Sequence, residues 1–197
     1  MRRRMLASVG KALPYDAEVE YLESDDGNQF INLGFLQEAL YKIETTLSIP
    51  ITAGSGSWHL VGAYQSSNIG TYYYAGWTSS FFFQKSYQDS ARIGTATKLP
   101  TKIIADVYSN TLSGFGGSTS LGSLSISSVA YFYIFAIRPT SRTKSGTRFY
   151  DFLYHSESRD LNLIPVRFTN KNGETEGAMY DRVSGRLFRN SGTGAFI

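Results

Sequence analysis

The most apolar stretch of this 197-residue chain is Val129-Ala-Tyr-Phe-Tyr-Ile-Phe-Ala-Ile-Arg138. Aromatic and β-branched side chains follow one another here without polar alternation, which predicts a strand that is covered on both faces. A helix that crosses a membrane needs about 18 to 20 apolar residues, and this stretch is much shorter. We therefore expect a buried strand and no membrane span.

On either side of this stretch, apolar and polar residues alternate with a period of two, which is typical of half-buried strands. The clearest case is Tyr41–Ile49, where every second residue is apolar or Thr. A meander of three strands is expected at Trp58–Tyr64, Thr71–Trp77 and Ser80–Lys85. The other expected elements are strands at Phe30–Leu33, Lys102–Tyr108, Thr147–His155 and Asp160–Thr169, and a hairpin at Met179–Phe188.

Two irregular segments complete this pattern. Pro165 interrupts the last long strand, which predicts a sheet edge or a bulge at that point. In Ser109–Ser128, 14 of 20 residues are Ser, Thr or Gly, which favours a hairpin over a core element. No segment carries an apolar stripe at helical spacing for more than about two turns. The sequence therefore predicts an all-β fold, an antiparallel β-sandwich or jelly roll with little or no helix.

Composition excludes several classes of protein. The chain has 14 Tyr, 13 Phe and 2 Trp, residues that disordered proteins lack. It has no Cys, which excludes thiol catalysis, thiolate metal sites and disulfides. Its net charge of +3 equals the contribution of Arg2, Arg3 and Arg4, so the remainder is neutral overall. A neutral body lacks the basic stripe of a nucleic-acid surface, and we expect no nucleic-acid partner.

The charge pattern also suggests how the chain is organised. We expect a basic N-terminal arm at residues 1–16 and a single β-sandwich domain at residues 17–197. An arm of this kind suits docking on a partner, and we predict that role for Arg2, Arg3 and Arg4. The apolar run Met5–Gly10 ends at Lys11 and is shorter than the roughly 7 to 15 residues of an export signal. We therefore expect a cytoplasmic chain that leaves the cell only on lysis.

Motifs at the two ends of the chain resemble one known family. Near the start stand Val19-Glu-Tyr-Leu-Glu-Ser24 and Gln29-Phe-Ile-Asn-Leu-Gly34, and near the end Ile164-Pro-Val-Arg167 and the run from Gly177 to Phe196. Together they resemble the opening and closing motifs of concanavalin A-like, laminin-G-like jelly rolls common in gut Bacteroidales and their phages. One departure is Asn-Leu-Gly at residues 32–34, where the family has Asp-Thr-Gly.

The resemblance implies a jelly roll that spans residues 17–197. In such a fold we expect the first and last strands to pair, so that the chain covers its own edge. Tyr180-Asp181 and Gly192-Thr-Gly194 are then structural residues of this closure rather than a binding site.

Related folds include glycoside hydrolases, which need two carboxylates on either side of a cleft. The nearest candidates are Glu23, Asp25 and Asp26, but Gly27 stands where a third alternating acid would be, and a turn explains these residues. The histidines, His59 and His155, lie in expected strands with no nucleophile elbow beside them. We therefore predict no catalytic residues and no enzyme.

Metal binding receives little support from the sequence. Two histidines without cysteines or a carboxylate cluster do not make a zinc site. The family resemblance leaves a structural calcium ion open, but the acids Asp25, Asp26, Asp89 and Asp106 are scattered. We predict no metal site and no cofactor.

The excess of aromatic residues is the remaining signal. Nine of them lie from Trp58 to Phe83, on consecutive expected strands. Because a strand alternates its faces, Tyr72-Tyr73-Tyr74 cannot all enter one core. The outward rings either stack on sugars, pack in a protein interface or are covered by neighbours in an assembly. For a glycan site, the predicted ligand-binding residues are Trp58, Tyr72, Tyr74 and Trp77.

These observations favour a non-enzymatic structural and interaction protein. With the family resemblance, they suggest a phage or prophage virion component, a head or tail jelly roll that engages partner subunits and host-surface glycans. The expected partners are protein subunits of an assembly, including further copies of this chain. The alternative is a lectin-like carbohydrate-binding or adhesion module of a bacterial surface.

Overall fold

In the computed structural model of this protein, the stretch at Val129–Arg138 forms two strands, β12 (Tyr131–Ile134) and β13 (Ala136–Arg138). Between them Phe135 has a φ of 65°, which a continuous strand cannot contain. Phe132 to Ile137 are all buried. The expected coverage on both faces is confirmed, whereas the prediction of one uninterrupted strand is wrong.

The structure describes most of the chain outside the first eleven residues. The described residues are 12–25, 27–37, 40–50, 58–66, 69–75, 80–86, 89–95, 97–122, 130–144 and 146–196, with the backbone alone at residue 40 and between residues 65 and 92.

A ten-stranded antiparallel sheet forms one layer, in the order β11-β10-β9-β4-β15-β16-β17-β18, with β1 beside β16 and β2 beside β15. Its strands are β1 (Ala17–Glu18), β2 (Leu22–Glu23), β4 (Leu40–Ser48), β9 (Thr101–Asp106), β10 (Thr111–Gly114), β11 (Gly117–Ser120), β15 (Arg148–Ser156), β16 (Asp160–Thr169), β17 (Thr175–Asp181) and β18 (Leu187–Arg189).

A six-stranded antiparallel sheet, in the order β3-β12-β5-β6-β7-β8, forms the other layer. Besides β12 it contains β3 (Ile31–Leu36), β5 (Trp58–Ser66), β6 (Ile69–Ala75), β7 (Ser80–Ser86) and β8 (Asp89–Thr95). The expected meander is confirmed, and β8 extends it by a strand that the sequence pattern did not indicate. A small hairpin of β13 and β14 (Ser141–Arg142) packs beside β5.

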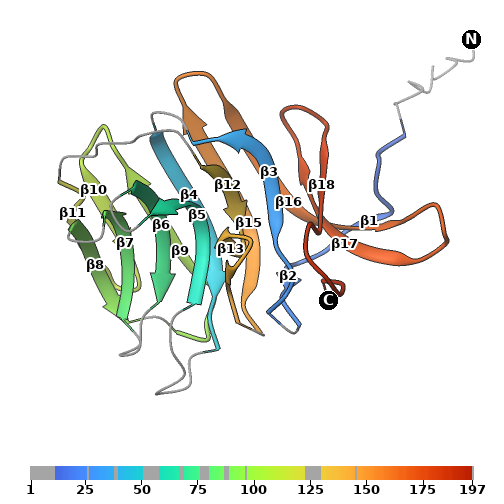
Figure 1. Ribbon diagram of the computed structural model, residues 1–197, viewed down its shortest axis with the longest axis horizontal. Coiled ribbons are helices and arrows are strands. Elements are labelled where there is room, and N and C mark those ends of the chain that lie inside the picture. The colour runs from blue at the N-terminus through green and yellow to red at the C-terminus, as the bar shows by residue number, and fades with distance from the viewer. Residues whose placement is uncertain are drawn as a thin grey trace, which may run out of the picture.

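The two sheets face each other and meet along both edges (Figure 1). At one edge β18 lies beside β3, and at the other β11 lies beside β8. The described residues contain strands and turns and no helix. The chain is therefore an all-β antiparallel sandwich, consistent with a jelly roll, as the sequence predicted.

The main core lies between the sheets, where alternation along the long strands places apolar residues. In β4 the buried residues Ile43, Thr45 and Leu47 alternate with more polar neighbours, as expected. A second apolar cluster of Ile164, Val166, Phe168 and Ala178 lies on the outer face of β16 and β17. Tyr15, at the end of the arm, packs on this cluster, with its ring centroid 4.8 Å from that of Tyr180.

The chain does not close by pairing its first strand with its last. The last strand, β18, pairs with β17 because Asp181 stabilises the tight turn between them, accepting backbone hydrogen bonds from Val183 and Ser184 at 3.1 Å each. The ends meet instead through the segment before β3. The Ser191 backbone N–H donates to the Phe30 carbonyl oxygen at 2.7 Å. The predicted structural role of residues 180–181 and 192–194 is consistent with this arrangement.

The Ser/Thr/Gly-rich segment forms the hairpin of β10 and β11, as predicted. Leu112 in β10 is nevertheless fully buried, so the hairpin contributes to the core. Residues 123–129 lie outside the described residues.

Candidate binding groove

A fork between two neighbouring strands positions the main candidate site. β15 and β16 pair from His155 opposite Asp160, at their connecting turn, to Phe152 opposite Leu163, and then separate. Beyond this point β16 pairs with β1 and β15 pairs with β2. The segment 17–23 therefore fills the fork like a wedge.

Pro165 lies where the partner of β16 changes. Its carbonyl oxygen accepts a hydrogen bond from the Val19 backbone N–H at 3.1 Å, and its nitrogen has no hydrogen to donate. The predicted sheet edge or bulge is not found here, because β16 is an internal strand and its register with β17 is continuous through Pro165 opposite Met179. The missing donor helps to explain why regular pairing ends here.

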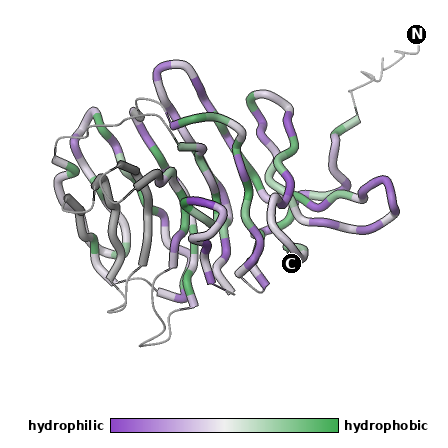
Figure 2. Tube along the Cα trace, in the orientation of Figure 1, coloured by the Kyte–Doolittle hydropathy of each residue, from purple (hydrophilic) through white to green (hydrophobic). Residues whose placement is uncertain are grey.

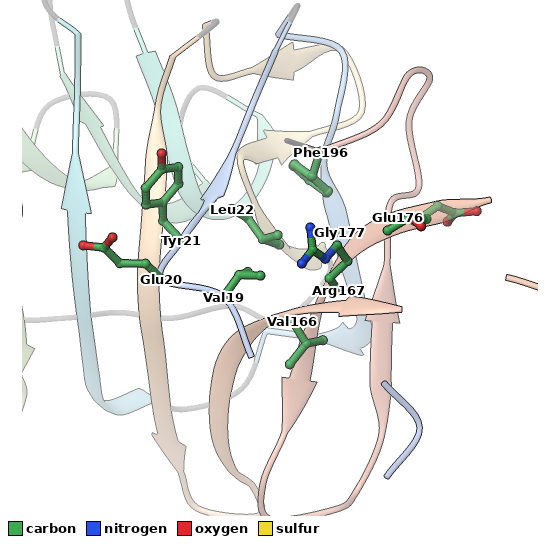
Figure 3. A pocket seen from close by; sticks show the side chains of 10 residues that line it. Val19, Glu20, Tyr21, Leu22, Val166, Arg167, Glu176, Gly177 and Phe196 are labelled. Carbon is green, nitrogen blue, oxygen red and sulfur yellow. The ribbon is translucent and has the colours of Figure 1, made fainter. Parts of the chain in front are cut away.

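An open groove of about 490 Å³ lies between this wedge and the β16–β17 hairpin. Val19, Leu22 and Phe196 lie around Gly177 and the Arg167 side chain (Figure 3). The full lining is Val19, Glu20, Tyr21, Leu22, Val166, Arg167, Thr175, Glu176, Gly177 and Phe196.

The floor of the groove is a packed part of the core. A Cβ at Gly177 would stand 2.7 Å from Leu22 Cδ2 and 2.9 Å from Phe196 Cβ, so glycine is what allows these side chains to approach the strand. Phe196 in turn packs on Phe135, with 4.7 Å between ring centroids. Because Leu22 and Phe196 are buried, the floor is apolar and preformed.

The rim combines charged and aromatic side chains. The Arg148 guanidinium lies 4.3 Å from the centre of the Tyr21 ring and donates to Glu23 at 2.6 Å. The hydrogen bond to Glu23 raises the pKa of Arg148 above its ordinary value. Glu20 and Glu176 add two carboxylates to the lining, and Arg167 adds one guanidinium group. The lining therefore has one more negative than positive side chain, and with its apolar floor it suits an apolar segment that carries positive charge.

A second hollow, of about 350 Å³, lies on the face of the ten-stranded sheet that is turned away from the core. Its charges are paired. Glu44 lies 3.1 Å from Lys42 Nζ and accepts a further hydrogen bond from Lys102. Burial raises the pKa of Glu44, but the two lysines lower it further, so it lies below its ordinary value. His155 Nδ1 is likewise hydrogen-bonded to Asp160.

The structure shows the surroundings of the residues weighed for catalysis. Glu23 is paired with Arg148, and Asp26 lies outside the described residues. His155 contacts the Tyr41 ring and Asp160, and no hydroxyl of the described part of the chain hydrogen-bonds it. Within the described ranges, no group of three or more His, Asp or Glu side chains could hold a metal ion.

Among the predicted ligand-binding residues, Trp58 is the one whose side chain the structure describes, and it does not line the groove. Trp58 is only 2% exposed and lies under Lys144, whose Nζ is 4.7 Å from the ring centre. Backbone register places Tyr72 opposite Gly62, and Tyr74 opposite His59. Tyr72 and Tyr74 therefore share one face of the six-stranded sheet. Trp77 and the predicted docking residues Arg2, Arg3 and Arg4 lie outside the described residues.

Sequence reasoning missed the groove because its two sides are far apart in the chain. Val19–Leu22, Arg167 and Gly177 all lie in the motifs that carry the family resemblance. The presence of both sides of the groove in these motifs is the signal that the sequence offers for the site, but from sequence the motifs predict chain closure alone.

The part of the chain that the structure describes contains no helix long and apolar enough to cross a membrane. No family model, no curated protein and no solved structure matches this chain.

Proposed function

We propose that this chain is a non-enzymatic structural and interaction protein whose groove binds the basic N-terminal arm of a second copy. The groove between the wedge 17–23 and the β16–β17 hairpin carries this proposal, because its floor is apolar and its lining has two carboxylates, Glu20 and Glu176, against one guanidinium group, Arg167. The arm supplies the complementary chemistry in sequence, with Arg2, Arg3 and Arg4 followed by the apolar run Met5–Val9.

The position of the arm's last residues supports this exchange. The Asp16 backbone N–H donates to the Arg167 carbonyl oxygen at 2.8 Å, and Thr169 Oγ1 donates to Asp16 at 2.7 Å. The arm therefore leaves the domain beside the same hairpin that borders the groove. A chain that exits near its own binding groove can join neighbouring copies through one repeated contact.

A place in a phage or prophage particle is the biological setting we propose. Its support is the resemblance of both chain ends to jelly rolls of gut bacteria and their phages. Repeated copies of one subunit, joined by arms, would suit such a particle.

Light scattering after size exclusion tests the exchange. We expect the full chain to form a multimer at low ionic strength, and a variant lacking residues 1–11 to be monomeric. The double variant Glu20→Arg with Glu176→Arg should also dissociate, whereas Glu157→Arg, an exposed acid outside the groove lining, should not. A monomeric full chain, or a multimer that survives loss of the arm, would contradict the proposal.

A lectin-like module is the second candidate. It is favoured by the register that places Tyr72 and Tyr74 on one face of the sheet. A glycan array probed with the full chain and with Tyr74→Ala and Trp77→Ala decides it, because glycan binding should weaken in these variants. Binding to no glycan would remove this candidate. Release of reducing sugars during incubation would show instead that the chain is an enzyme.

A further inference from the structure

We propose that the β13–β14 hairpin and the strand β5 beneath it form a binding site for an acidic polysaccharide, separate from the groove. The site is defined by Arg138, Arg142 and Lys144 on the hairpin side and by Trp58 and Tyr64 on β5. The proposal deepens the lectin-like candidate by naming the site and the ligand class, and it does not depend on the exchange of arms.

The hairpin brings positive charge together without neutralising it. Residues 138–148 contain Arg138, Arg142, Lys144 and Arg148 and no acid. Arg148 is paired with Glu23. The other three cations form no ion pair with a carboxylate among the residues that the structure describes. Figure 2 shows the hairpin turn as a hydrophilic patch in front of β5.

Each of these cations lies over an aromatic ring. The Arg138 guanidinium carbon is 4.7 Å from the centre of the Tyr64 ring, and that of Arg142 is 5.1 Å from the centre of Phe30. Lys144 Nζ is 4.7 Å from the centre of Trp58. Such contacts are attractive and hold a flexible side chain near one position.

Hydrogen bonds fix the two guanidinium groups further. Arg138 Nε donates to Ser141 Oγ at 2.7 Å, and Arg142 Nη1 donates to Asn28 Oδ1 at 3.1 Å. Arg142 Nε also donates to the Pro139 carbonyl oxygen. In the described parts of the chain, both Nη groups of Arg138 and Nη2 of Arg142 have no hydrogen-bond partner. These donors are held in place and remain available to the oxygens of a carboxylate, sulfate or phosphate group.

Hydrogen bonds connect the base of the hairpin to neighbouring segments. The Thr143 backbone N–H donates to the Phe135 carbonyl oxygen at 2.8 Å, and Thr143 Oγ1 donates to Thr147 Oγ1 at 2.8 Å. Beneath the hairpin, His59 has a pKa below its ordinary value, first because it is buried and then because Arg138 is nearby. The charge of Arg138 therefore contributes to the electrostatic environment of His59, after the larger effect of burial.

The neighbouring strand favours a sugar chain over an acidic peptide. Tyr74 lies opposite His59 in the ladder, and Tyr72 lies opposite Gly62 and Gln84. The backbone register therefore places aromatic and amide residue types on β6 and β7, the strands that follow β5 in the sheet. Flat aromatic rings and amides are the groups that bind the apolar faces and hydroxyls of sugar rings.

Affinity electrophoresis in gels containing a polysaccharide tests the proposal. We expect polygalacturonate and dextran sulfate to retard the full chain, and neutral dextran to leave its mobility unchanged. Comparison of the two acidic gels distinguishes carboxylate from sulfate recognition. Rising salt should weaken the retardation because the contacts are ionic.

Variants locate the site. Arg138→Gln with Arg142→Gln should weaken binding at least tenfold. Arg189→Gln is the matched control, since Arg189 also lies over a ring, Phe168 at 4.4 Å, but on β18. It should change binding less than twofold. Tyr64→Leu keeps every charge and removes one supporting ring, and it should weaken binding several-fold. Thermal unfolding of each variant verifies that it is folded.

Several outcomes would overturn the proposal: no retardation by either acidic polysaccharide, equal retardation by dextran, or equal loss in Arg189→Gln and the double variant. Polyglutamate competing as strongly as polygalacturonate would show that the surface recognises acidic proteins instead. If the chain is monomeric and still binds acidic polysaccharide, the proposed exchange of arms is excluded, while the proposed polysaccharide site is supported.

Discussion

Gly192 lies so close to Asn28 that a Cβ on the glycine would stand 2.0 Å from the Asn28 carbonyl oxygen. The two residues are far apart in the chain, and their contact is where the C-terminal segment meets the segment before β3. Gly192→Ala should therefore force the two backbones apart and lower the free energy of unfolding by about 2 to 3 kcal/mol. Urea-induced unfolding measures this loss.

The control for that substitution is Gly117→Ala in β11, where the added Cβ would be no closer than 3.4 Å to any atom beyond its chain neighbours. It should change stability by less than about 1 kcal/mol. Equal losses in the two variants would show that the contact with Asn28 does not determine the cost.

At Phe135 we expect the glycine variant to be more stable than the alanine variant, which is the reverse of the usual order. Its backbone has a φ of 65°, which a side chain makes costly, while its ring packs on Phe149 at 4.6 Å between centroids. Both Phe135→Ala and Phe135→Gly lose the ring, but only glycine relieves the backbone. We expect the glycine variant to be more stable by about 1 kcal/mol.

Phe132 provides the comparison, because it is equally buried and has no positive φ. Here Phe132→Gly should be less stable than Phe132→Ala by about 0.5 to 1 kcal/mol. If the alanine variant were more stable than the glycine variant at both positions, the positive φ at Phe135 would carry no energetic cost.

Asp181 is fully buried and accepts four hydrogen bonds around the turn before β18. The donors are the backbone N–H groups of Asn162, Val183 and Ser184 and the Ser184 hydroxyl. Asp181→Ala leaves them unsatisfied and should cost about 2 to 4 kcal/mol. Asp160→Ala removes an exposed acid paired with His155 and should cost under about 1 kcal/mol, as measured by urea-induced unfolding. Similar losses in both variants would contradict this role of Asp181.

His59 should make stability depend on pH in mildly acidic solution. Its pKa in the folded chain is lowered, first by burial and then by Arg138, so the unfolded chain binds the proton more tightly. Its contribution is therefore fully present above about pH 6.5, the unfolded value, and is lost as pH falls towards the folded pKa. His59→Gln should lose less stability than the wild type between pH 7.5 and pH 5. Parallel stability curves over this range would contradict the assignment.

Local patterns in the sequence were sufficient for the fold class. Alternation in Tyr41–Ile49 and the apolar run before Arg138 predicted buried strands, because side-chain period and burial are properties of neighbouring residues. Turn residues placed the hairpin before β18. The break at Phe135 had no local signal, because its positive φ is maintained by the packing of its ring on Phe149 and Phe196.

The candidate sites depended on contacts that no local pattern contains. The groove exists because β15 and β16 separate and residues 17–23 enter the fork, which brings Leu22 next to Gly177. Trp58 was predicted as a ligand-binding ring, whereas the structure buries it and places Lys144 over it. The sequence by itself determined the fold class and most of the long strands with their alternating faces. Only the tertiary structure decided which strands separate and which charges lie over which rings, because those choices depend on packing between distant segments.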